Sequence, residues 1–177
     1  MLIKLEKITD KIIDFVGLIT AILLLLMILN VAYDVFARYI FHNSSIAMQE
    51  FEWHLFAVIM LYGTGYALKH NAHVRVDFLY DNFSPKKQAW INILGTFLFL
   101  LPLALLVINA SYDFVMDAYT THEVSQDPGG LPYRWIIKAQ IPFAFIFLIF
   151  CAFNFVIHNI NVLRGSEKIA KEEEVEL

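Results

Sequence analysis

Four apolar runs, each long enough to cross a lipid bilayer, constrain this chain more than any other feature of its sequence. A helix needs about 20 mostly apolar residues to span a hydrocarbon core of about 30 Å. The runs cover residues 12–36, 48–68, 89–110 and 136–157. Hydrophobic residues make up 59% of the 177-residue chain, more than a soluble domain of this size can bury. The sequence therefore predicts one all-α integral membrane domain, residues 1–177, with four transmembrane helices.

The distribution of Lys and Arg predicts how these helices are oriented. Most of the 13 basic residues lie before the first run, between the second and third runs, or after the fourth. Only Arg38, Arg134 and Lys138 lie on the other side. Loops rich in Lys and Arg stay in the cytoplasm. We therefore expect cytoplasmic termini and a cytoplasmic middle loop.

The segments at the ends of the runs predict further local structure. Residues 166–177 are rich in Glu, and we expect them to form a solvated, disordered tail. Asn43-Ser44-Ser45 offers helix-capping residues before Ile46, Phe51 and Trp53. Either a short interfacial helix precedes the second transmembrane helix, or the second helix begins early.

Prolines punctuate the predicted helices. Ser84 followed by Pro85 is typical of a helix start, and Pro132 is expected to begin the last helix. Pro102 and Pro142 fall inside the third and fourth runs. Each removes a backbone hydrogen bond, so we expect a bend at each.

Ionisable residues near the predicted membrane boundary are candidates for specific contacts, because a charge in the bilayer usually faces protein or water. Asp34 and Arg38 are four residues apart and can pair on one helix face, or either can bond to another subunit. Glu50 and His54 have the same spacing, and interfacial solvation alone would also explain them.

Histidines raise the alternative of a haem-binding membrane anchor, which holds its cofactor between facing helices. His70, His73 and His158 are predicted near the cytoplasmic ends of their helices, whereas His54 lies deeper. The first two belong to a polar run, and no histidine of the last run matches the level of His54. Haem ligation is therefore the weaker interpretation, and we predict no cofactor.

The sequence lacks the motifs that mark other classes of function. The chain has no phosphate-binding glycine loop, no paired cysteines for zinc and no plausible nucleophile-histidine arrangement, so we predict no enzyme. Its single cysteine, Cys151, lies in the last run and cannot form an intrachain disulfide. Nothing indicates a nucleic-acid partner. Four helices also leave little room for the internal repeats of a self-sufficient transporter, which favours an accessory subunit.

Small residues offer surfaces for close helix packing, within the chain or against a partner. In the first run Gly17 and Ala21 are four residues apart. Gly63, Gly65 and Ala67 lie along the second run. Both uses remain open from the sequence.

The order of several motifs resembles one family. They are Arg38 at the end of the first run, Glu50-Phe51-Glu52-Trp53, the segment Tyr66-Ala67-Leu68-Lys69-His70-Asn71-Ala72-His73-Val74-Arg75-Val76-Asp77, and Gly129-Gly130-Leu131-Pro132-Tyr133-Arg134-Trp135 before Lys138 and Pro142. The chain resembles the DctQ family, the small membrane subunit of tripartite ATP-independent periplasmic (TRAP) transporters. The resemblance covers nearly the whole chain.

The resemblance implies a non-catalytic subunit in the inner membrane. In such systems a periplasmic binding protein delivers a solute, often an organic acid, to a membrane complex driven by a sodium gradient. The small subunit pairs with a large elevator-type permease subunit and helps hold the stationary scaffold of that permease in the membrane lipids. The alternatives are a haem- or quinone-associated anchor of an oxidoreductase and an orphan membrane scaffold.

The resemblance also suggests interface residues. Arg38, Glu50, Glu52 and Trp53 are candidates for the outer contact with the large subunit. His73, Arg75 and Asp77 are candidates for ordering the cytoplasmic loop or binding the same partner from inside. Arg134 and Trp135 are further outer candidates. Solvated or lipid-headgroup contacts are the alternative for every one of them.

Overall fold

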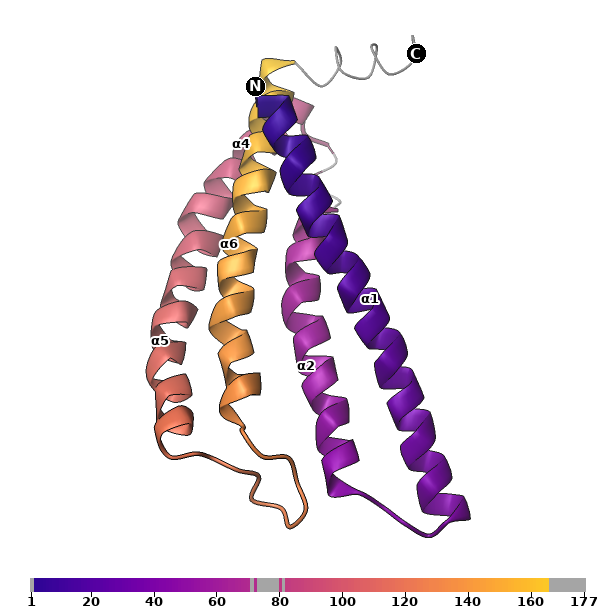
Figure 1. Cartoon of the computed structure of the whole chain (residues 1–177). Helices are drawn as coiled ribbons and strands as arrows, with labels where there is room; N and C mark the ends of the chain where they lie inside the picture. The colour runs from indigo at the N-terminus through magenta and orange to yellow at the C-terminus, as the bar shows by residue number, and fades with distance from the viewer. Residues whose placement is uncertain (1, 71, 73–79, 81, 166–177) are drawn as a thin grey trace.

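The regular structure of the chain is helical throughout the residues that the computed structural model describes, which are 2–70, 72, 80 and 82–165 (Figure 1). The elements are α1 (Leu2–Ile40), α2 (Ile46–Lys69), α4 (Pro85–Gly95), the π-helix η1 (Thr96–Leu100), α5 (Leu101–Thr120) and α6 (Trp135–Arg164). The predicted tail, residues 166–177, lies outside the described residues. The all-helical prediction is confirmed for the described part of the chain.

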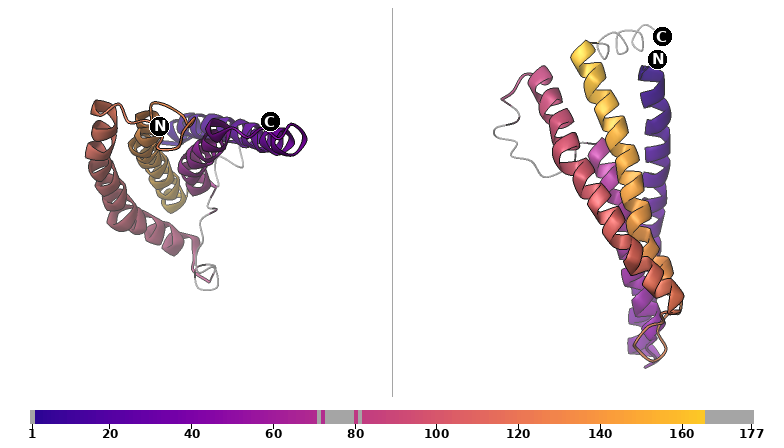
Figure 2. Two further views of the ribbon diagram at one scale, coloured as in Figure 1. Left: turned by 90° about the horizontal axis from the view of Figure 1, so that it is seen from below. Right: turned by 90° about the vertical axis from the view of Figure 1, so that its left-hand side faces the viewer.

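The helices form an open row rather than a closed bundle. α1 packs against α2, α2 against α6, and α6 against both α4 and α5, and α1 also meets α6. Figure 2, seen from below, shows α6 between α5 on one side and α2 on the other. α1 begins and α6 ends at the same end of the row, here named the terminal end. The loops 41–45 and 121–134 lie at the opposite end, here named the loop end, and α1 and α6 diverge toward it (Figure 1).

Three stretches are long and apolar enough to cross a membrane: α1, the continuous segment Pro85–Thr120, and α6. α2 has 24 residues, but Glu50, Glu52 and His54 near its start make it less apolar. Length and composition therefore identify three spans among the described residues, not the predicted four. The crossing by α2 stays a prediction.

Helix boundaries differ from the predicted ones for local reasons. α1 extends past both ends of the run 12–36, because exposed Lys and polar side chains can continue a helix beyond its apolar part. α2 begins directly at Ile46 after an extended Ser45, so the separate interfacial helix is absent from this described stretch and the early start is correct. The start at Ser84 and Pro85 is confirmed.

Pro132 does not begin the last helix, and that prediction was wrong. Tyr133 has φ of 59°, which is left-handed and incompatible with a helix running through it. The backbone N–H of Arg134 donates to the carbonyl of Glu123 at 3.1 Å, which closes the loop just before α6 begins at Trp135.

Pro102 explains the π-helix η1. A proline inside a helix lacks its N–H, and its ring clashes with the carbonyl four residues earlier. The wider π turn of Thr96–Leu100 lies immediately before this proline, and the Leu101 N–H donates to the carbonyl of Thr96, five residues back. α6 continues through Pro142 without such an interruption.

Two of the small residues are used for packing within the chain. A Cβ at Gly17 of α1 would lie 2.3 Å from the Tyr66 ring of α2. A Cβ at Gly65 would lie 2.8 Å from Phe147 and 2.9 Å from Cys151 Sγ of α6. These glycines let α2 approach both neighbours closely, whereas a Cβ at Gly63 would meet open space.

Candidate interaction site at the loop end

Glu50, in the first turns of α2, anchors the long loop 121–134. Only 7% of the residue is exposed. The Leu131 backbone N–H donates to Glu50 Oε2 at 2.5 Å, and the Ser125 hydroxyl donates to Glu50 Oε1. A buried carboxylate needs such donors, because leaving it unsatisfied is costly. Glu50 therefore acts as a clamp that holds the loop against the start of α2.

Gly130 makes this clamp possible. A Cβ at this position would lie 2.4 Å from Ser125 Oγ and 2.8 Å from Glu50 Oε2. The neighbouring Gly129 has φ of 86°, a conformation that side chains disfavour. The Gly-Gly pair thus satisfies two different requirements, a left-handed turn and a close approach.

Charged residues at the start of α6 and directly before it secure the other side of the same loop. Lys138 pairs with Glu123, and its ammonium lies 4.0 Å from the centre of the Phe114 ring. Arg134 Nε lies 3.6 Å from Glu123 Oε1, and the guanidinium lies 5.7 Å from the centre of the Trp53 ring. The predicted residue Arg134 therefore joins the loop to α2. Its neighbour Trp135 stacks edge-on against Tyr119, with ring centres 5.4 Å apart.

Arg38 and Asp34 form the predicted ion pair on α1. The Asp34 side chain is buried, whereas 48% of the Arg38 side chain is exposed. Arg38 thus presents charge at the surface while compensating a buried carboxylate. Trp53 is 41% exposed, and Glu52 is half-buried. These predicted interface residues all lie near the loop end, but the chain itself joins only some of them.

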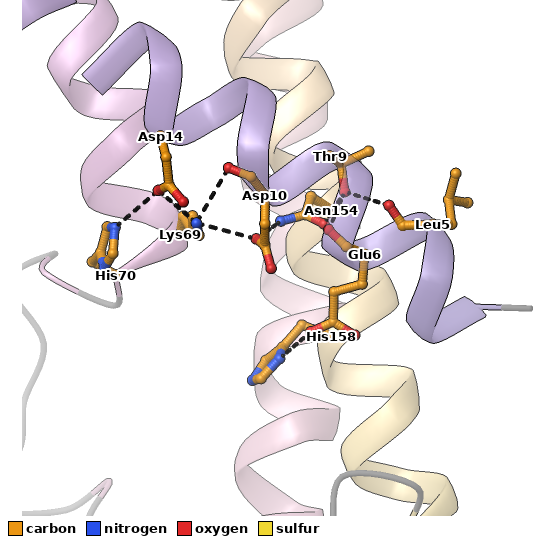
Figure 3. A network of polar contacts seen from close by, with 9 residues as sticks. All are labelled: Leu5, Glu6, Thr9, Asp10, Asp14, Lys69, His70, Asn154 and His158. Atoms are coloured by element: carbon orange, nitrogen blue, oxygen red, sulfur yellow. Dashed lines mark hydrogen bonds and ion pairs between the residues drawn. The ribbon is translucent and has the colours of Figure 1, made fainter. Parts of the chain in front are cut away.

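A second polar cluster lies at the terminal end (Figure 3). Lys69 Nζ lies 2.6 Å from Asp14 Oδ1 and 3.4 Å from Asp10 Oδ1. The Asn154 amide donates to Asp10 Oδ1 at 2.9 Å, and the Thr9 hydroxyl donates to Asn154 Oδ1. This terminal cluster ties α1 to both α2 and α6.

Glu6 extends the terminal cluster along α6. Its carboxylate lies 2.7 Å from His158 Nδ1 and accepts a bond of 2.5 Å from the Asn161 amide. Sequence reasoning singled out His158, as a candidate haem ligand, but not Glu6, Asn154 or Asn161. Their signal was the helical spacing of Asn154, His158 and Asn161 in an otherwise apolar run.

The described histidines do not form a facing pair for haem. His158 contacts Glu6 of α1, and His70 lies 3.7 Å from Asp14 and against the Tyr66 ring. His54 lies near the loop end, far along α2 from His70. No group of His, Cys, Asp and Glu in the described part of the chain is arranged to hold a metal ion. His73, Arg75 and Asp77 lie outside the described residues.

Taken with the three apolar spans, the open helical row defines an integral membrane protein. Its charged residues near the loop end mostly connect helices and loops. The chain belongs to the DctQ family: the family profile described as "Tripartite ATP-independent periplasmic transporters, DctQ component" matches residues 26–162, well over half of the chain. No curated protein matches it. The resemblance seen in the sequence is thus confirmed, and the protein is the small component of a TRAP transporter.

Proposed function

We propose that this chain scaffolds the large elevator-type permease subunit in binding-protein-dependent, sodium-driven uptake of an organic acid or similar solute. It carries no solute itself. In this proposal the large subunit is its permanent partner in the inner membrane, and the periplasmic binding protein docks transiently at the loop end.

The openness of the helical row supports this role more than any other observation. Only 11% of the residues in the most apolar stretch of α1 are buried within the chain, and the same holds for Pro85–Thr120. The corresponding share for α6 is 39%. Helices that the rest of the chain covers so little offer wide apolar faces to lipid or to a partner. Such a row suits a subunit that enlarges a scaffold.

We further propose that α2 also crosses the bilayer and that both termini are cytoplasmic. At a rise of about 1.5 Å per residue, the 24 residues of α2 are long enough to cross the hydrocarbon core. α2 also packs between two helices that are themselves span candidates. Four crossings agree with the arrangement in which α1 begins and α6 ends at the terminal end (Figure 1).

The proposed outer interface uses the exposed residues Arg38, Glu52 and Trp53 directly. Glu50 and Arg134 shape it by holding the loop 121–134 in place. Trp135 supports the same loop from α6. The cytoplasmic candidates His73, Arg75 and Asp77 keep the role predicted from the sequence.

Co-purification tests the proposed function. The chain is tagged in its native operon and extracted in mild detergent, and its bound proteins and absorption spectrum are recorded. We expect a stoichiometric large permease and no Soret band. A chain without the permease refutes the scaffold role, and a Soret band supports the haem-anchor alternative.

A charge reversal tests the interface. Glu52→Lys is expected to lower the amount of permease retained, because Glu52 is partly exposed near the start of α2. Asp117→Lys is the matched control, with the same reversal at an exposed residue of α5, outside the loop 121–134. Equal retention in both variants would remove Glu52 from the interface.

A further inference from the structure

Two sets of charged residues lie on different sides of the first turns of α1. The carboxylates are spaced by four residues and are Glu6, Asp10 and Asp14. Their partners His158 and Lys69 belong to α6 and α2, so this side of α1 faces the rest of the chain. Lys4, Lys7 and Lys11, here named the lysine stripe, fall within an arc of about 60°, at about 100° per residue, and all three are exposed. The lysine stripe therefore faces away from the neighbouring helices.

The lysine stripe keeps positive charge that the described structure does not neutralise. Within the described residues, no ion pair involves Lys4 or Lys11. The cations at the loop end differ, because Arg38, Arg134 and Lys138 each pair with a carboxylate of the chain. A surface with such uncompensated positive charge attracts an anionic partner.

The length of α1 places the lysine stripe at the membrane surface. A rise of about 1.5 Å per residue gives its 39 residues a length of about 58 Å, whereas a bilayer with its headgroups is about 40–45 Å thick. The apolar run 12–36 fits the hydrocarbon core, so residues 2–11 lie at its edge or beyond. Ile8 and Ile12 are 59% and 46% exposed beside the lysines. A helix side that mixes lysines with exposed apolar side chains is typical of the headgroup region, because the lysine stems contact lipid while the ammonium groups reach the phosphates.

We propose that the lysine stripe binds the headgroups of anionic phospholipids such as phosphatidylglycerol. The ammonium groups of Lys4 and Lys11 contact lipid phosphates, and Ile8 and Ile12 contact the upper part of the acyl chains. The occupant is lipid rather than free phosphate, because the stripe continues directly into the exposed apolar face of α1, a span candidate. The inference needs α1 in the bilayer but no permease, so it is independent of the proposed scaffold role.

Photolabelling measures this selectivity. The full chain is reconstituted in phosphatidylcholine vesicles that contain a trace of either phosphatidylglycerol or phosphatidylcholine, each with the same diazirine near the head of one acyl chain. Labelling of residues 2–15 is quantified by mass spectrometry, and the ratio of the two lipids removes unselective contact. One lysine beside an anionic headgroup should raise this ratio about fivefold. Lys4→Gln combined with Lys11→Gln should bring it close to one, whereas Lys4→Arg combined with Lys11→Arg should keep it.

Lys86→Gln combined with Lys87→Gln is the matched control, because it makes the same change in net charge at exposed residues of α4. The ratio at residues 2–15 should not change in this variant, and a fall as large as that of the α1 variant would contradict a specific stripe. A ratio of one in the wild-type chain, or an unchanged ratio after the two α1 substitutions to Gln, overturns the proposal.

Two further arms separate other anions from lipid. A ratio that collapses when inorganic phosphate is added at constant ionic strength would assign the lysine stripe to free phosphate. A ratio that rises above one only after residues 166–177 are removed would assign the stripe to the Glu-rich tail of this chain. Either result overturns the proposal, and a ratio that both treatments leave unchanged supports it.

Discussion

Gly130→Ala should release the loop 121–134 from α2. The backbone at Gly130 does not need a positive φ, so the effect of the substitution is steric. The new Cβ would lie 2.4 Å from Ser125 Oγ, 2.5 Å from Ser125 Cβ and 2.8 Å from Glu50 Oε2. Because the Ser125 Cβ is attached directly to the backbone, rotation of its hydroxyl cannot relieve the clash. The loop itself must move.

The cost follows from the bonds that this movement breaks. Glu50 accepts one bond from the Leu131 N–H and one from the Ser125 hydroxyl. Hydrogen bonds to charged groups contribute about 1.5–3 kcal/mol each. Since the displaced carboxylate regains some hydration, we expect a net loss of about 3 kcal/mol in the free energy that keeps the loop closed. Amide exchange in the loop should then accelerate on the order of a hundredfold.

Hydrogen–deuterium exchange on the detergent-solubilised protein measures this change directly. Peptides from residues 121–134 should lose protection, while the terminal half of α6 keeps it. Gly63→Ala is the control, because a Cβ there meets nothing within 4 Å, and alanine stabilises a helix interior by about 0.5–1 kcal/mol. Unchanged protection of the loop in Gly130→Ala would refute the clamp.

Two further substitutions and one labelling experiment test the remaining packing. Gly17→Ala should lower the melting temperature measured in detergent, because its Cβ would lie 2.3 Å from the Tyr66 ring; an unchanged temperature would contradict the close α1–α2 approach. Asn154→Leu should destabilise the protein by about 1–3 kcal/mol, since it leaves Asp10 without its amide donor, and the loss should show as faster exchange at the start of α1. Cys151 should resist maleimide labelling in the folded protein, because it is fully buried; rapid labelling of native protein would mean that α2 and α6 separate.

The loop-end residues show how far sequence reasoning reaches. The pairing of Asp34 with Arg38 was predictable, because residues four apart on a helix are neighbours whatever the tertiary structure. The contacts of Glu50 with residues 75 and 81 positions away were not. The motif containing Gly129 and Gly130 marked the segment as specific, but its partner on α2 was visible only in the fold.

The terminal cluster shows the same limit. Glu6 and Asn161 are 155 residues apart, and neither local spacing nor charge counting indicates that they meet. The sequence also left open which helices pack against Gly17 and Gly65, because a small residue permits close packing but does not specify the neighbouring helix. The structure gives each of them a neighbour within the chain.

The sequence by itself determined the helical class, the approximate places of the helices and the family. The bilayer core holds no water to bond the backbone, so a long apolar run satisfies its backbone hydrogen bonds within a helix. Only the tertiary structure decided that these helices form an open row and that Glu50 holds a distant loop. Those features depend on which helix faces meet, and side-chain packing between distant segments sets that choice.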